Sequence, residues 1–248
     1  MAKLTGKLAT IDLYSSTTTQ PGPYQVGQIA WDVNGKAFRY VLNGATAMTV
    51  GQLQQSAAGM GATYTNMAVG TAGAKGDAFI QVTNGTSTIT SQQFEGGSIL
   101  VYTAGTAVIG DEYTIVAVTG TLTTGGALKV YLDRPLRTAI TTSATVTMVP
   151  SPFAGVVPTP LTTSTGMCVG VAVYAIPASA YGWIQTHGQS SAIIDGSAVV
   201  IGGMVGINNT VTGSISAGGT AMPLNVYVGK ALATGASGKG ISVFLNID

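Results

Sequence analysis

Apolar and polar residues alternate along many short stretches of the chain. Two stretches show this most clearly, and their apolar positions are Leu128, Val130 and Leu132 in one and Ile241, Val243 and Leu245 in the other. Alternation with a period of two is typical of a β-strand that buries one face. The pattern therefore predicts a strand at each place, with these apolar residues facing the core.

Turn sequences separate the alternating stretches. They are Asn34-Gly35, Asn84-Gly85, Gly125-Gly126 and Asp195-Gly196. Asn-Gly pairs favour hairpin turns of type I′, because both central residues of that turn need a positive φ. We therefore expect a hairpin at each pair. After the first turn, alternation would place Phe38 and Tyr40 on the same face of the returning strand.

Helical periodicity is nearly absent. The segment 48–60 is the best candidate for a short helical turn, but it contains Gly51 and lacks a good capping residue. Turn signals at intervals of roughly 8–12 residues are typical of sandwiches and barrels. The sequence therefore predicts an all-β fold of glycine-rich β-sandwich or barrel domains with little helix. The polar residues 1–24 are expected to form an extended N-terminal arm.

Two segments have the composition of linkers. Residues 60–76 are small and polar, and residues 149–166 contain Pro150, Pro152, Pro158 and Pro160. Proline suits edges and extended connections rather than central strands. The predicted division is an N-terminal arm and hairpin region at 1–70, a middle β-domain at 71–150, a proline-rich connection at 151–165 and a C-terminal β-domain at 166–248.

The scarcity of charge is the most informative feature of the composition. Charged residues make up 8% of the 248 residues and the mean hydropathy is +0.40, whereas roughly a quarter of an ordinary soluble domain is charged. The longest apolar run, 197–207, is broken by glycines and is shorter than a membrane span of roughly 20 residues. We therefore expect no association with a membrane. Because interface cores are depleted in charge, we expect much of the surface to be buried against other subunits.

The basic residues give no sign of nucleic acid binding. The net charge is +1 and the ten Lys and Arg residues are scattered, whereas phosphate binding needs several of them clustered. The first residues, MAKLTGKLATIDLY, contain no apolar stretch of the kind found in a signal peptide. We therefore expect neither nucleic acid as a partner nor export from the cytoplasm.

Cys168, His187 and Asp195 invite comparison with a catalytic triad. Cys168 lies in a G-x-C-x-G motif at 166–170, but a nucleophile elbow needs a preceding strand and a following helix, and its acid precedes the histidine. Here the residues after the motif have the character of a strand, and Asp195 follows His187. We expect no catalytic residue, and Cys168 as a small buried side chain.

No metal or cofactor site is predicted either. One His and one Cys cannot supply a zinc tetrad. The start of a calcium loop at Asp32–Gly35 is not completed, because Asn43 stands where the bidentate Glu is needed. Glu95 and the pair Asp111-Glu112 are acids of the type that glycosidases use, but an acidic pair at the start of a hairpin is more typical of a solvated turn.

The segment YGWIQ is expected to be a strand with Tyr181, Trp183 and Gln185 on one face. Tyrosine and tryptophan are frequent interface anchors, so these three are candidate interface residues. Tryptophan is also highly buried in most folds, so a place in the core of the C-terminal domain is an equal alternative.

Two regions of the chain resemble capsid-associated proteins of tailed bacteriophages. YGWIQTHGQSSAIIDGSAVVIGG and VYVGKALATGASGKGISVFLNI look like the C-terminal region of head decoration, or cement, proteins, and GKAFRYVLNGATAMTVGQLQQ is similar to the opening of such virion proteins. The matching stretches cover about a third of the chain and are structural motifs rather than catalytic ones.

This resemblance implies a non-enzymatic protein of the capsid surface that is made in the cytoplasm of a bacterial host. It also implies trimers or other oligomers of the chain, and binding to the major capsid protein. A tail-fibre or receptor-binding subunit, or another shell or tube subunit, is the alternative. No cofactor is expected in either case.

Overall fold

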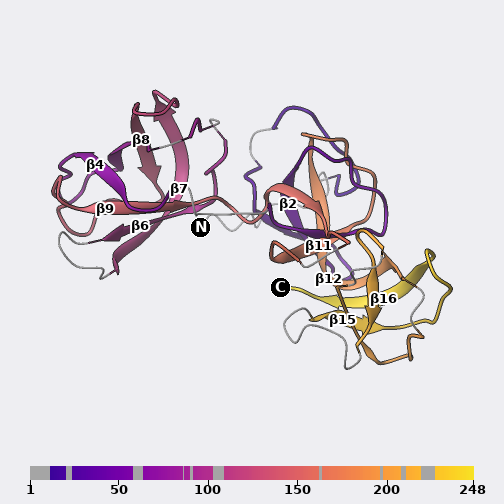
Figure 1. Ribbon diagram of the computed structural model, residues 1–248. Helices are drawn as coiled ribbons and strands as arrows, with labels where there is room; N and C mark the ends of the chain where they lie inside the picture. Colours follow the sequence, from indigo (N-terminus) through magenta and orange to yellow (C-terminus); the bar gives the residue numbers. More distant parts are fainter. Residues whose placement is uncertain are drawn as a thin grey trace. The chain divides into compact units, whose positions relative to one another are not determined.

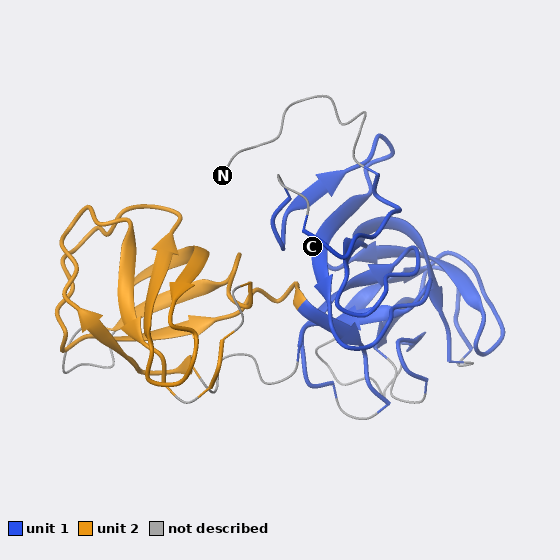
Figure 2. Ribbon diagram, turned by 90° about the horizontal axis from the view of Figure 1, so that it is seen from above, with its two compact units in different colours: residues 1–57, 155–248 blue, residues 58–154 orange. Residues whose placement is uncertain are grey.

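The protein is built from strands that form two compact units. The computed structural model describes residues 12–20, 24–57, 64–85, 87–89, 92–102, 109–161, 164–195, 198–207, 211–218 and 227–248 (Figure 1). These residues form sixteen strands and contain no α-helix, which confirms the predicted all-β class. Unit 1 comprises residues 1–57 and 155–248, and unit 2 comprises residues 58–154 (Figure 2).

Unit 2 is a closed antiparallel barrel. Its strands, in the order in which they pair around the barrel, are β4 (Met67–Thr71), β5 (Phe79–Thr83), β8 (Ala127–Leu132), β7 (Ile109–Gly120), β6 (Ser98–Tyr102) and β9 (Thr145–Val149). The last strand pairs with the first through Met67 and Val146. Closure leaves the sheet without an unpaired edge.

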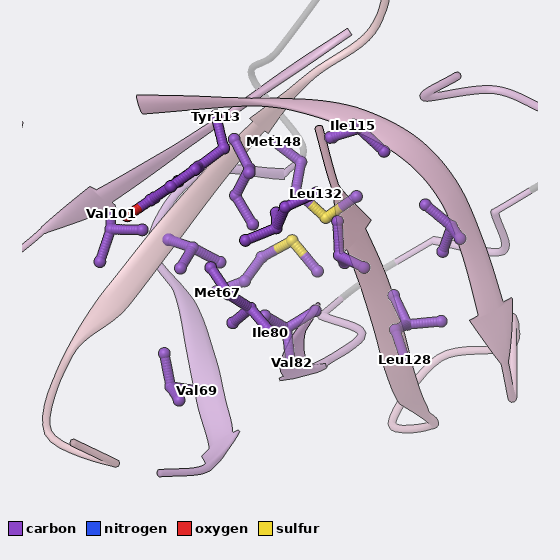
Figure 3. Packing of buried hydrophobic residues seen from close by; sticks show 14 of the residues in the cluster. Met67, Val69, Ile80, Val82, Val101, Tyr113, Ile115, Leu128, Leu132 and Met148 are labelled. Atoms are coloured by element: carbon purple, nitrogen blue, oxygen red, sulfur yellow. The ribbon is translucent and has the colours of Figure 1, made fainter. Parts of the chain in front are cut away.

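The barrel interior explains the alternating sequence of its strands. Leu128, Val130 and Leu132 are buried on one side of β8, as predicted. Figure 3 shows labelled side chains from different strands, among them Met67 and Met148, pointing toward one another inside the barrel. Each strand therefore contributes its apolar face to one shared core.

Unit 1 contains a second ring of strands. Its members are β2 (Ala37–Asn43), β10 (Ala154–Pro158), β3 (Leu53–Gln55), β11 (Cys168–Ala172) and β12 (Tyr181–Ile193), and a pairing between β2 and β12 closes the ring. The pairings β10–β3, β3–β11, β11–β12 and β12–β2 are antiparallel. A ring of five strands cannot be antiparallel throughout, so β2 and β10 run parallel.

A sheet extends from this ring beyond β12. Its further strands are β16 (Gly240–Asn246), β15 (Tyr227–Ala231), β13 (Met204–Ile207) and β14 (Ile215–Ala217) (Figure 1). The long strand β12 belongs to both parts, because residues 181–187 pair with β2 and residues 187–193 pair with β16. Ile241, Val243 and Leu245 face the core of this sheet, as predicted. At its opposite end the sheet finishes with β1 (Ile29–Trp31), which pairs with β2.

Unit 2 is inserted into a hairpin of unit 1. Strands β3 and β10 are antiparallel neighbours, with Gln55 opposite Val157. A Cβ added to Gly155 would lie 3.7 Å from the Cβ of Ala57, so the two ends of the insertion are adjacent. The chain is thus divided at 57 and 154, whereas the sequence suggested boundaries at 70, 150 and 165. The region 1–57 shares a sheet with the C-terminal strands instead of forming a separate part.

The predicted turns differ in outcome. The Gly125-Gly126 hairpin joins β7 to β8 as expected. At Asn34-Gly35 the hairpin exists, but Gly35 alone has a positive φ, of 77°, so the predicted type I′ turn is wrong. The N–H groups of Asn34 and Lys36 both bond to one carboxylate oxygen of Asp32 at 2.8 Å. This interaction and the Gly35 N–H bond to the Asp32 carbonyl favour a three-residue loop, a type I turn followed by glycine.

Asn84-Gly85 does not form a hairpin, and that prediction is wrong. Strand β5 pairs with β4 and β8 rather than with the next strand along the chain. The Asn84 side chain instead bonds to neighbouring carbonyl groups and holds this segment beside the β7–β8 turn. The fourth pair includes Gly196, which lies outside the described residues.

Candidate functional site

Trp183 lies in an aromatic cluster inside unit 1. Its exposed fraction is 2%, and its ring centroid lies 5.0 Å from that of Tyr40 and 5.6 Å from that of Tyr24. Tyr181, exposed by 4%, stacks on Tyr40 with the ring planes inclined by 12°. Burial raises the pKa of Tyr40 well above its usual value, with a smaller contribution from the neighbouring tyrosines.

Gly182 allows a tyrosine hydroxyl to lie across the strand. A Cβ at this position would lie 2.2 Å from the hydroxyl oxygen of Tyr174. That hydroxyl accepts the N–H of Trp183 at 2.8 Å and donates to the carbonyl of Ser15. Burial raises the pKa of Tyr174 to about 12, so the hydroxyl stays protonated and keeps its donor at neutral pH. The residue order Tyr-Gly-Trp therefore follows from packing.

Tyr181 and Gln185 are also hydrogen-bonded to other residues of the same chain. Thr17 and Tyr181 exchange backbone hydrogen bonds of 3.0 and 2.7 Å, so the described part of the expected N-terminal arm contacts β12. Gln185 is exposed by 1% and donates its amide to the carbonyls of His187 and Gln189. The structure places all three candidate interface residues, Tyr181, Trp183 and Gln185, inside unit 1, the alternative left open by the sequence.

Cys168 and His187 have different surroundings. Cys168 packs against the hydrophobic core between the strands of unit 1, and burial raises the pKa of its thiol to about 12. His187 lies against the rings of Trp31 and Phe244, with centroids 6.2 and 5.3 Å away. Phe244 alternates with the buried Val243 and Leu245 and points away from that core. A protonated thiol and an imidazole on opposite faces do not form a nucleophile and its base.

Asp111 is the centre of a polar network on unit 2. Its carboxylate accepts bonds from Arg137, from the Thr138 hydroxyl at 2.9 Å and from the Tyr113 hydroxyl at 3.1 Å. The bonds from Arg137 are the main reason why the pKa of Asp111 lies below its usual value. The network contains one acid, Asp111, and its carboxylate is occupied by these bonds. The bonds join the start of β7 to the segment after β8.

Two buried asparagines play matching roles in the two units. Asn43 donates its side-chain amide to the carbonyls of Thr46, Ile176 and Pro177, and Asn84 donates to those of Ser87, Leu122 and Thr123. Asn43 is the last residue of β2 and Asn84 directly follows β5, and each is followed by glycine. The sequence analysis missed this role, although the repeated Asn-Gly pair was its signal.

An exposed area with apolar side chains lies on the sheet of unit 1. We call it the outer face and define it by Met204, Lys230 and Phe244, which are neighbours on β13, β15 and β16. Met204 is exposed by 59% and Phe244 by 42%. Further exposed apolar residues at its border are Val200, Ile201, Tyr227 and Leu232. Alternation had identified the buried half of β16, but the exposed residues of β13, β15 and β16 were not predicted to form a surface.

The described residues contain no group of three or more His, Cys, Asp or Glu side chains placed to hold a metal ion. In the same part of the chain, no helix is long and apolar enough to cross a membrane. Comparison of the whole sequence and structure with protein-family models, with curated proteins and with solved structures gave no match. The resemblance to phage decoration proteins therefore stays a prediction.

Proposed function

We propose that this chain is a non-enzymatic structural protein of a virion. It decorates and stabilises the head of a tailed bacteriophage by binding the major capsid protein and neighbouring copies of itself. The observation that carries the proposal is the outer face, where Met204 on β13 and Phe244 on β16 expose much of their side chains on either side of Lys230 on β15. Exposed apolar side chains gathered on one face of a sheet favour protein–protein contact.

The charge distribution supports a protein partner. Lys230 is the charged residue among the three that define the outer face, and the cores of protein interfaces are depleted in charge. A phosphate-rich partner would require a cluster of basic side chains. The outer face therefore fits the surface of another folded protein better than it fits nucleic acid.

The architecture supports a structural role. Unit 2 is closed by the β4–β9 pairing, and the five-strand ring of unit 1 is closed by the β2–β12 pairing, whereas the sheet that extends from this ring ends at β1 and β14. Closed ladders satisfy backbone groups internally and hide sheet edges from unwanted partners. A component of a pressurised shell benefits from such construction, and it needs no reaction chemistry.

The test is binding to heads of the same virus that lack this protein. The proteins compared are the wild type, the Met204→Ser/Phe244→Ser variant and a Tyr131→Ser control, which removes an aromatic residue of similar exposure, 36%, from unit 2. We expect the wild type and the control to sediment with the heads equally. Loss of central anchors costs about 2 kcal/mol or more, so the double variant should bind roughly thirtyfold more weakly.

Electron microscopy of the loaded heads then locates the protein. Density on the outer surface of the shell is the expected result. Wild-type protein that ignores heads but joins tails or fibres contradicts the proposal and supports the receptor-binding or tube alternative.

A further inference from the structure

In the described part of the chain, strand β1 is the end strand of the unit 1 sheet, and no strand pairs with its outer side. On its inner side it pairs with β2, with Ala30 opposite Phe38. Gln28 accepts a bond from Tyr40, and Asp32 donates one to Lys36, across the hairpin. Because backbone groups alternate in direction along a strand, Ile29 and Trp31 direct theirs outward. Among the described residues, none forms a backbone bond to this outer side of β1.

The side chains along this edge are apolar. Ile29 and Trp31 are exposed by 38% and 47%, whereas Ala30 between them is buried. Natural proteins usually protect such edges with lysine, proline or inward-pointing charge. The three residues of β1 carry none of these, so the edge is available to another strand.

The edge is complementary to itself. In an antiparallel pair of two copies related by a two-fold axis at Ala30, Ile29 lies opposite Trp31 of the second copy. Each of these two residues directs one N–H and one C=O outward. Each copy therefore supplies two donors and two acceptors, and the pair of copies can form four hydrogen bonds. All of these groups pair in this register.

Charge is also complementary in this register. Asp32 directly follows β1 in the sequence, and it lies opposite Gln28 of the second copy, so two carboxylates do not meet. One oxygen of the Asp32 carboxylate accepts the N–H groups of Asn34 and Lys36. The side-chain oxygen of Gln28 accepts the N–H of Gln25, which leaves the side-chain N–H groups of Gln28 as donors toward the acid.

The exposed rings near β1 lie on the face of the sheet rather than at its edge. Trp31 lies against His187 of β12, and His187 lies against Phe244 of β16, so the row of rings runs inward from β1. The contact at the edge therefore consists mainly of backbone hydrogen bonds. A three-residue edge buries less than the roughly 1,000 Å² of a stable interface.

We infer that the β1 edge joins two copies of this chain into a continuous sheet, with Ile29 paired to Trp31 across a two-fold axis. This deepens the proposed function by naming the surface through which neighbouring copies meet. Such an edge associates weakly in dilute solution and strongly when a shell holds the copies close together.

The test is the mass of the full-length chain over a concentration series, measured by sedimentation without any capsid. Ile29→Pro removes an outward N–H that forms no backbone hydrogen bond with the described residues of the chain. The variant should fold, because proline is tolerated on edge strands. Val33→Pro is the matched control, since it lies in the first central position of a type I turn, where proline is favoured. We expect the wild type and the control to associate alike, and Ile29→Pro to weaken association at least about tenfold.

Trp31→Thr provides a second variant, because threonine keeps the β-propensity and removes the ring. It decides the outcome if Ile29→Pro fails to fold. The inference is overturned if the wild type shows no concentration-dependent association up to about 1 mM, or if a folded variant associates as the wild type does. Since no capsid is present, failure here is distinct from failure to bind heads.

Discussion

At the residue scale, single buried side chains explain features of the sequence that suggest chemistry. The motif Tyr-Gly-Trp looks like an exposed anchor, yet Trp183 fills the space beside Tyr24 and Tyr40. Gly182 is needed because the Tyr174 hydroxyl occupies the place of its side chain. Residues that are rare in this chain are therefore used for packing.

The two tryptophans give a direct test of this assignment. Trp183→Ala should lower the free energy of unfolding of unit 1 by about 3–5 kcal/mol, because a fully buried ring is lost. Trp31→Ala removes a ring that is 47% exposed and should cost much less. Both tryptophans lie in unit 1, so in each variant the remaining one reports unfolding in urea by its fluorescence. Equal losses in the two variants would contradict a core position for Trp183.

At the element scale, polar side chains decide how strands are joined. Asp32 sets the type of its hairpin loop by binding two N–H groups. Asn43 and Asn84 fix the segments that follow their strands. Asp111 joins the start of β7 to Arg137 and Thr138 beyond β8.

The Asp111 network should make unit 2 sensitive to acid. The pKa of Asp111 is lowered in the folded state, so its contribution to stability is present above the unfolded value of about 3.9 and is lost as pH falls through the folded value. Asp111→Asn should therefore lower the melting temperature of unit 2 at neutral pH, and the difference from the wild type should shrink below about pH 4.

Calorimetry over this pH range measures the effect. Glu112→Gln is the control, because it removes the neighbouring exposed charge and leaves the network intact. A difference between Asp111→Asn and the wild type that stays constant with pH would refute the assignment of the acid sensitivity to Asp111.

How far the sequence predicts the structure depends on the range of the interactions involved. The buried faces of β8 and β16 follow from alternation, which is a local property. The turn at Asn34-Gly35 was only half predicted, because the Asp32 side chain outweighs the preference of the Asn-Gly pair. The position of Trp183 could not be decided, since its neighbour Tyr40 comes from a distant strand, β2. The outer face was not predicted, because the candidate interface residues were chosen for their rarity rather than from the exposed half of each strand.

At the scale of the whole molecule, the chain is one domain interrupted by another. The strands of unit 1 come from both sides of the insertion, and β2 and β10 precede and follow it within one ring. Composition alone suggested linkers at residues 60–76 and 149–166, but these segments contain strands β4 and β10, and the division of the chain lies at 57 and 154. It could not show that the outer segments belong together, because that depends on pairing between remote strands.

The insertion predicts that unit 1 folds without unit 2. Replacement of residues 58–154 by Asn-Gly should give a two-residue hairpin between Ala57 and Gly155, which already lie side by side. We expect the shortened chain to keep the fluorescence of a buried Trp183 and to unfold cooperatively. An unfolded product would show that unit 1 depends on unit 2.

The inserted barrel also has a consequence for the order in which the protein folds. While unit 2 is unfolded, formation of the β3–β10 pair must close a loop of about 100 residues, which costs roughly 3 kcal/mol more in chain entropy than a tight turn. Once the barrel has formed, its two ends are already close and this entropy has been lost. The folding rate of unit 1 therefore depends on whether unit 2 has folded, even without contacts between the two units. A destabilising substitution in the core of the barrel should delay the burial of Trp183.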